Sequence, residues 1–269
     1  MTRDLKALIP DSEWAIKLHR ITLKIIGLWP PDNRKAHEMV RSKLRLLCNV
    51  TTIFFVTTIP TLISLIQVWG DMILMIENLQ LSLPLVMTVF KIYVIWYKQE
   101  ALAPLIDMIE KDWIKVKMKE ERDVMLKCAM ITRVIAMCGM FILICAVSVT
   151  LILPCFGLMI RQETNLTDHE RPLPLQSYYL HDVSKSPHFE LTFVAQGIIV
   201  FTGGLTYSVV DHFLGLLVIH MCGQLQNLNL RLTHMENYPN FDAALKYNVQ
   251  DHTRLIRCST YRGDRNKFE

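Results

Sequence analysis

Hydrophobic and polar positions divide the chain most clearly between residues 190 and 231. Residues 191–210 contain no Asp, Glu, Lys or Arg, and the same holds for residues 213–230, which follow the pair Asp211-His212. About 20 apolar residues in a helix are enough to cross a bilayer. One helix over the whole stretch would be roughly 60 Å long at about 1.5 Å per residue, which exceeds the roughly 40–45 Å of hydrocarbon and headgroups. We therefore expect a membrane span that continues into water.

The part of this stretch expected in water mixes polar and apolar positions. Leu225, Leu228 and Leu232 recur at helical spacing and form a stripe, and the positions between and before them are polar: His220, Gln224, Gln226, Asn227 and Asn229. Such a pattern is typical of an amphipathic helix whose apolar stripe packs on neighbouring elements. The sequence therefore predicts that the leucine stripe packs on partner helices.

Three further apolar blocks predict membrane spans. The first is residues 46–68, which are uncharged and contain Pro60 as an expected kink. The second is residues 78–97, which end in aromatic residues, and the third is residues 134–160, which are rich in Met and Cys. Residues 98–133 alternate apolar and charged positions. We expect them to form a charged, solvated helix rather than a span.

The beginning of the chain has a different pattern. It lacks the apolar core and small-residue cleavage site of a secretory signal peptide. In residues 14–26 apolar positions recur at helical spacing among basic ones, and Gly27 and Pro30-Pro31 follow. This pattern predicts a basic amphipathic helix that ends at the glycine. The helix would suit either the membrane surface or packing on the body of the protein.

Composition agrees with a membrane protein and excludes several other classes. Hydrophobic residues make up 51% of the chain and charged residues 20%, and the mean hydropathy is +0.26. The net charge of +4 is modest, without a basic tract interleaved with aromatics, so we expect no nucleic-acid partner. The seven cysteines form no CxxC pair, which predicts no zinc site. Hydrolase, zinc-protease and nucleotide-binding motifs are missing as well, so we expect neither an enzyme nor a cofactor.

The distribution of Lys and Arg predicts the orientation of the spans. Nine lie in residues 1–43, none in 69–77, eight in 98–133, three in 161–190, and seven from Arg231 onward. Connections rich in Lys and Arg stay in the cytoplasm. The alternation over four spans therefore predicts a cytoplasmic N-terminus, opposite to that of G-protein-coupled receptors.

This orientation divides the chain into four parts. Residues 1–43 would be a cytoplasmic amphipathic N-terminal segment. Residues 44–230 would be a four-span membrane domain with an extracellular loop at residues 161–190. Residues 231–258 would be a cytoplasmic helical segment, and residues 259–269 a divergent tail.

Several polar or small residues in or near the spans carry separate predictions. Asn165 begins an Asn-Leu-Thr acceptor sequence in the loop expected outside, which predicts glycosylation. Asp211 fits either the inner interface or a paired polar contact that matters for folding or gating. Lys91 lies close enough to the inner end of its span to extend its ammonium to the interface. Gly203-Gly204 would permit close helix approach.

In their order and spacing, residues from about 14 to 257 resemble the insect odorant receptor family. The marks of this resemblance are Gly27-Leu28-Trp29-Pro30, Tyr97-Lys98-Gln99-Glu100, Asp112-Trp113, Leu173-Pro174-Leu175, Ser186-Pro187, Phe189-Glu190, Gln196, Asp211, His220-Met221-Cys222-Gly223-Gln224-Leu225 and His252-Thr253-Arg254-Leu255-Ile256. The resemblance implies an all-α integral membrane protein that contains four transmembrane helices of a seven-helix receptor fold. It further implies a plasma-membrane, ligand-gated cation channel, assembled with a co-receptor subunit as a hetero-oligomer, a tetramer, in membrane lipid.

In that family a volatile odorant lies in a pocket among the second, third, fourth and sixth spans. By depth in the spans, the resemblance points to eight wall residues here: Met87, Phe90, Ser148, Leu151, Ile152, Ile198, Phe201 and Thr202. Apolar burial would supply most of the affinity at about 25 cal/mol per Å². Ser148 or Thr202 would offer a polar group.

Three alternatives and one departure accompany this interpretation. A gustatory receptor of the same superfamily, a non-conducting four-span interaction protein and an unrelated transporter are the alternatives. The departure is that the resemblance ends near Cys258, before three further spans of the family. We therefore expect a C-terminally truncated sequence, lacking the pore-lining span.

Overall fold

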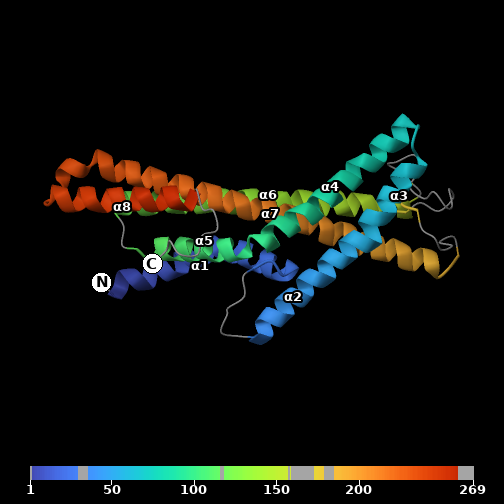
Figure 1. The fold of residues 1–269 in the computed structure, drawn as a ribbon, viewed down its shortest axis with the longest axis horizontal. Coiled ribbons are helices and arrows are strands. Elements are labelled where there is room, and N and C mark those ends of the chain that lie inside the picture. The colour runs from blue at the N-terminus through green and yellow to red at the C-terminus, as the bar shows by residue number, and fades with distance from the viewer. Residues whose placement is uncertain are drawn as a thin grey trace. The chain divides into compact units, whose positions relative to one another are not determined.

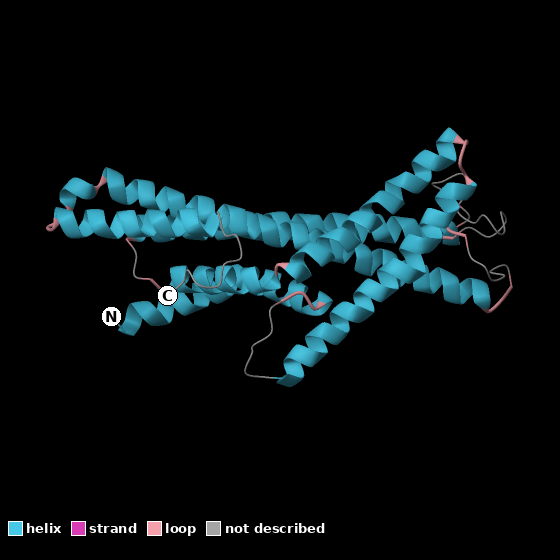
Figure 2. Cartoon of the chain, viewed as in Figure 1, coloured by secondary structure: helices cyan, strands magenta, loops and turns pink. Residues whose placement is uncertain are grey.

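The structure, a computed structural model, describes residues 2–29, 36–115, 118–156, 158, 173–178 and 185–259. The described elements are helices that follow one another along the chain (Figure 1), and Figure 2 shows the loops that join them. Their bounds are α1 Thr2–Ile26, α2 Ala36–Thr51, η1 Thr52–Thr58, α3 Ile59–Gln67, α4 Met72–Tyr97, α5 Gln99–Ile114, α6 Lys119–Cys155, α7 His188–Thr233, η2 Met235–Asn237 and α8 Phe241–Ser259. The all-α prediction is confirmed for this part of the chain.

The N-terminal helix α1 ends where the sequence predicts. Gly27 has a φ of 80°, a left-handed conformation that an L side chain rarely adopts. A Cβ there would also lie 2.6 Å from the Ser42 carbonyl oxygen and 2.8 Å from the Leu46 nitrogen. One face of α1 is buried, with Ala15, Ile16 and His19 almost inaccessible. Of the two settings that the sequence allows, packing on the protein therefore applies to this face.

The first predicted span is continuous but not regular. A π-helical segment, η1, joins α2 to α3, and the Ile59 N–H donates to the carbonyl of Phe54, five residues earlier. Pro60, at the start of α3, has no N–H to donate and disfavours a regular helix on its N-terminal side. The irregularity expected at Pro60 is thus a π-helical stretch just before it.

The second span begins earlier in the structure than the sequence predicts. Helix α4 starts at Met72 rather than at residue 78, because Asp71 accepts hydrogen bonds at 3.0 and 3.2 Å from the N–H groups of Ile73 and Leu74. An Asp at this position satisfies donors that the first helical turn leaves unpaired. The nine-residue loop expected at 69–77 is therefore a short turn that contains Gly70.

The prediction of one solvated helix over residues 98–133 is wrong. The region contains α5 and the first turns of α6, which begins at Lys119. Glu121 accepts a hydrogen bond of 3.1 Å from the Met118 N–H, as the third-position glutamate of a capping box does. Helix α5 also has a buried side, which includes Ile109, Asp112 and Trp113.

The stretch that dominates the sequence pattern is one helix, α7, of 46 residues. Its leucine stripe is only partly buried within the chain, and packing of the stripe on partner helices stays a prediction. Leu225 and Leu232 are exposed, and only Leu228 is buried. The inward side instead carries four polar residues at helical spacing, each less than a tenth exposed: His220, Gln224, Asn227 and Arg231.

The chain divides into two compact units. Unit 1 contains Met1–Thr22, Tyr97–Ala136 and Asp211–Glu269, and unit 2 contains Leu23–Trp96 and Met137–Val210. Four helical stretches in the described part are long and apolar enough to cross a membrane: His37–Gln67, Met72–Tyr97, Lys119–Pro154 and His188–Thr233. The four spans predicted from the sequence correspond to these stretches.

Candidate functional site

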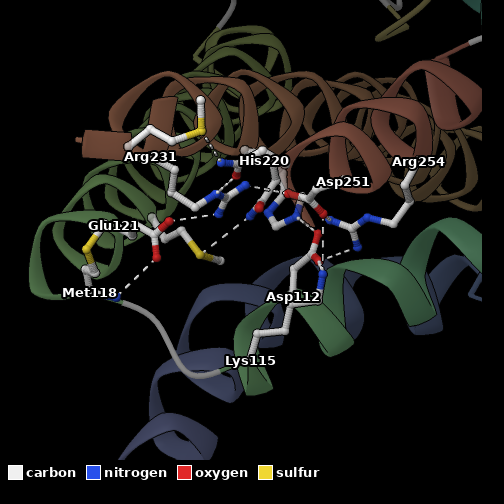
Figure 3. Close-up of polar contacts among 12 residues, drawn as sticks. Asp112, Lys115, Met118, Glu121, His220, Arg231, Asp251 and Arg254 are labelled. Carbon is white, nitrogen blue, oxygen red and sulfur yellow. Dashed lines mark hydrogen bonds and ion pairs between the residues drawn. The ribbon is translucent and has the colours of Figure 1, made fainter. Parts of the chain in front are cut away.

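The buried polar side of α7 belongs to a charge network in unit 1, and Arg231 is at its centre. Figure 3 shows its guanidinium between Glu121 and Asp251, with N–O distances of 2.8 Å to Glu121 and 2.6 Å to Asp251. Its Nε donates to the Asn248 side chain at 3.0 Å. All three nitrogens of one arginine are therefore engaged by α6 and α8.

The second half of the network surrounds Asp112 of α5, whose side chain is fully inaccessible to solvent. One of its oxygens accepts from Arg254 at 2.6 Å, and the other lies 3.2 Å from the His220 Nε2. Burial alone would raise the pKa of Asp112. The hydrogen bonds from His220 and Arg254 outweigh that effect and, with their charge, lower the pKa to about 2.

This network links four helices of unit 1 and is balanced in charge. Lys115 approaches both Asp112 and Asp251, at 3.5 and 3.6 Å, so three carboxylates face Lys115, Arg231 and Arg254. Paired groups of this kind fix the packing of helices, because each carries a large penalty when left alone. The residues of the network include no activated nucleophile and no general base hydrogen-bonded to one. Its role is therefore structural: it holds the four helices together.

The sequence did not predict this network. Asp112 and Arg254 were named only as marks of a family resemblance, and His220 also as a polar position of an amphipathic helix. Glu121 and Asp251 were not named at all. The available signal was the spacing of polar residues at positions 220, 224, 227 and 231 of α7, which places them on one side of a helix.

Hollows are also present in the described part of unit 1. A cavity of about 560 Å³ lies beside the network and is lined by residues including Arg231, Tyr238 and Tyr247. A mostly apolar groove of about 470 Å³ lies among α5, α7 and α8. None of the eight predicted wall residues lines either hollow.

The predicted wall residues lie in unit 2, and those of α6 and α7 are at the same level. Leu151 packs on Gly197, where an added Cβ would lie 2.9 Å from a Leu151 methyl carbon. Leu143 approaches Gly204 still more closely, with a corresponding distance of 2.5 Å. The close helix approach expected at Gly203-Gly204 is therefore present. The two contacts place Ser148, Leu151 and Ile152 of α6 at about the level of Ile198, Phe201 and Thr202 of α7.

The two predicted residues of α4 lie farther along the bundle. Leu85 of α4 contacts Gly203 of α7, and the Lys91 ammonium lies 3.4 Å from the centre of the Tyr207 ring. Phe90 is therefore level with Tyr207, about 7 Å along the helix from Thr202 at 1.5 Å per residue. The structure brings six of the predicted residues to one level and places Met87 and Phe90 beside the next turns.

The remaining polar predictions have separate outcomes. The Lys91 ammonium is close enough to Tyr207 for a cation–π interaction, and its extension to the interface stays a prediction. Asp211 is exposed on the surface of α7. Asn165 lies outside the described residues, so its glycosylation stays a prediction.

The fold is similar to that of solved insect olfactory receptor structures. The chain is similar to the solved structure of the insect olfactory receptor OR5 from Machilis hrabei, with a TM-score of 0.77 and 15% identity. It is similar to that receptor in complex with eugenol as well, with a TM-score of 0.78 and 15% identity. Each match covers 94% of this chain and 65% of the receptor chain, so the chain spans about two thirds of the receptor's length. No curated protein matches the sequence.

The family assignment rests on the sequence itself. A family model described as the seven-transmembrane odorant receptor matches residues 71–262, which is more than two thirds of the chain. The matched region includes three of the four candidate spans and all residues of the charge network. The family is one of receptors rather than of enzymes. The chain is a multi-pass membrane protein that belongs to the seven-transmembrane odorant receptor family.

Proposed function

We propose that the chain binds volatile hydrophobic molecules as part of an odorant receptor subunit. The family match over residues 71–262 is the observation that carries this proposal. The binding wall would be formed in unit 2 by side chains of α4, α6 and α7. Large apolar side chains are exposed along these three helices, among them Phe90, Ile152 and Ile198.

The chemistry of these side chains suits a small apolar ligand. An odorant that loses roughly 250 Å² of apolar surface to the wall would gain about 6 kcal/mol at about 25 cal/mol per Å². Part of this gain is offset by the lost freedom of the ligand. Thr202 donates a hydrogen bond of 3.3 Å to the Ile199 carbonyl and retains acceptor capacity for a ligand donor.

Ligand-induced stabilisation tests the proposal directly. Eugenol, which the similar receptor binds in its solved complex, is the first compound to try, followed by a panel of volatile esters, alcohols and terpenes. We expect compounds that raise the unfolding temperature of the wild-type chain to lose most of that effect in Phe201→Ala. The matched control is Phe141→Ala, which removes an exposed phenylalanine of α6 outside the proposed wall. Equal losses in both variants, or no stabilisation by any compound, would count against the proposal.

We further propose that the complete protein joins a co-receptor in the plasma membrane, forms a hetero-tetramer and gates a cation channel. Support comes from the family match and from the Lys and Arg counts, which favour a cytoplasmic N-terminus. The orientation is tested by antibody access to an N-terminal tag, which should require permeabilised cells. The partnership is tested by co-purification with the co-receptor. Staining of the tag in intact cells would refute the orientation, and failure to co-purify would refute the partnership.

A further inference from the structure

A segment between α6 and α7 enters the interior of unit 2. Leu173, Leu175 and Gln176 are each at most 2% exposed, which is unusual for a connection between helices. Its backbone is held by the rest of the unit. The Leu175 N–H donates to the Gln196 side chain at 2.9 Å, and the Tyr178 N–H donates to the Pro60 carbonyl at 3.4 Å.

Polar side chains of α3 and α4 meet this segment from the other side. The Asn78 Nδ2 donates to the Ser64 hydroxyl at 2.7 Å, and that hydroxyl donates to the Gln176 carbonyl at 3.4 Å. Asn78 also donates to the Thr61 carbonyl at 3.2 Å. A continuous chain of hydrogen bonds thus runs from α4 through α3 to the inserted segment.

Four polar atoms around this chain have no hydrogen-bond partner among the described residues. They are both amide atoms of Gln176, the Asn78 Oδ1 and the Thr57 Oγ1, on residues that are each 1% exposed. Buried polar groups in native proteins are almost always hydrogen-bonded, because an unpaired one keeps its full desolvation penalty. Ser64 accepts from the Asn78 side chain and donates to the backbone carbonyl of Gln176. Thr61 links Asn78 to Thr57, because its carbonyl accepts from Asn78 and its hydroxyl donates to the Thr57 carbonyl. Thr57, Asn78 and Gln176 therefore belong to one hydrogen-bonded network.

The chemistry of these atoms indicates what they bind. The Gln176 amide offers both a donor and an acceptor, Asn78 offers an acceptor, and the Thr57 hydroxyl can do either. A hydroxyl group, which also donates one hydrogen bond and accepts others, complements this set. A bare carbonyl would leave the acceptors unpaired, and a charged group would have no counter-charge among these residues.

We propose that Gln176, Asn78 and Thr57 form a buried binding site for a hydroxyl group beneath the inserted segment of unit 2. The hydroxyl is that of an internal water or that of a small ligand. The ligand source rests on the proposed odorant-binding function, and the water source does not. In both cases the bound hydroxyl completes the hydrogen bonds that hold residues 173–178 against α3 and α4.

Two substitutions that keep side-chain shape test the site by the sign of their effect. Gln176→Met and Thr57→Val remove unpaired atoms if nothing binds there, and the unfolding temperature then rises. If a hydroxyl is bound, the same substitutions remove its partners, and we expect the unfolding temperature to fall by about 2 °C or more. Gln67→Met, at an exposed glutamine of α3, is the matched control and should change little. Thr57→Val gives the sign even if Gln176→Met fails to fold.

Benzyl alcohol and toluene distinguish the two sources, because they differ by a hydroxyl on the same ring. A bound water predicts that both substitutions lower the unfolding temperature without any ligand. A bound ligand hydroxyl predicts that benzyl alcohol stabilises the wild-type chain more than toluene, and that Gln176→Met and Thr57→Val abolish the difference. Substitutions that raise the unfolding temperature or leave it unchanged, together with equal effects of the two compounds, would overturn the proposal. If neither compound stabilises the wild-type chain, the ligand source of the hydroxyl is refuted, and the signs without ligand still decide the hydroxyl site. The ligand-binding function itself is judged separately, by the full compound panel.

Discussion

Replacing Arg231 by Met tests whether the charge network holds unit 1 together. Met keeps the long apolar stem and removes the guanidinium, which donates to Glu121, Asp251 and Asn248. Asp251 keeps Arg254 at 2.9 Å and Lys115 at 3.6 Å. Glu121 is left with the Met118 N–H as its hydrogen-bond partner among the described residues. The main loss should therefore come from a buried carboxylate without a counter-charge.

The size of this loss follows from that geometry. Removing one partner of a buried ion pair costs about 3–5 kcal/mol, because the other charge is left uncompensated. At about 2–4 °C per kcal/mol for a chain of this size, the unfolding temperature should fall by roughly 6–20 °C. The double variant Arg231→Met with Glu121→Gln neutralises the stranded carboxylate and should recover at least about 1 kcal/mol, a typical coupling between contacting residues.

The assay is thermal unfolding of the purified chain in detergent, followed by tryptophan fluorescence. Arg257→Met is the matched control, since Arg257 is exposed on α8 and should contribute within about 0.5 kcal/mol. Similar losses in Arg231→Met and Arg257→Met would refute the reasoning. An additional loss, rather than a recovery, in the double variant would show that Glu121 is not the stranded charge.

Three other predictions use the same unfolding assay. Gly27→Ala should lower stability by about 2 kcal/mol or more, because the new Cβ would meet backbone atoms at 2.6 and 2.8 Å in a left-handed conformation; Gly70→Ala, where no atom lies within 4 Å, controls for the conformational part alone. The pKa of Asp112 is lowered to about 2 from 3.8. Its ionised form therefore adds about 2 kcal/mol to the free energy of unfolding above pH 4, and this contribution is lost as the pH falls through 2. Asp112→Asn should be less stable than the wild type at pH 7 and should not lose that contribution at low pH. Burial, followed by the charges of His212 and Arg133, lowers the pKa of His19 to about 4 from 6.5. The unfolded state therefore takes up the proton first, and the free energy of unfolding falls as the pH drops from 6.5 to 4. His19→Phe should flatten this pH dependence, and an unchanged pH profile in the variant would contradict the prediction.

The existence of the spans could be predicted from the sequence, whereas some of their bounds could not. Blocks such as residues 191–210 have no charge over the length of a bilayer crossing, and little else satisfies their backbone there. Helix α4 begins before the predicted block of residues 78–97, because one side chain, Asp71, caps it at Met72. The break between α5 and α6 similarly depends on the Glu121 side chain. A hydropathy profile averages over many residues and does not detect single contacts of this kind.

The inward side of α7 could not be predicted from the same rule. In water an apolar stripe is expected to face the interior, and Leu225 and Leu232 do the opposite. Three of the four polar residues on the inward side have a partner far along the chain; His220 and Asp112, for example, are 108 residues apart. Pairings over such separations are set by tertiary packing, which one sequence does not reveal. Spacing within one helix is fixed, but the level of one helix against another is not. The level of α6 against α7 depends on how Leu151 meets Gly197, and that of α4 on how Leu85 meets Gly203.

Photoaffinity labelling tests the central claim, that this chain binds small hydrophobic molecules in unit 2, most directly. A small apolar diazirine would be crosslinked to the chain in membranes, and the labelled residues identified by mass spectrometry. The account predicts labelling of α6 and α7 around Ser148–Ile152 and Ile198–Thr202 that an excess of the unlabelled parent compound suppresses. Suppressible labelling confined to the unit 1 cavity beside Arg231, or labelling that no competitor reduces, would contradict it.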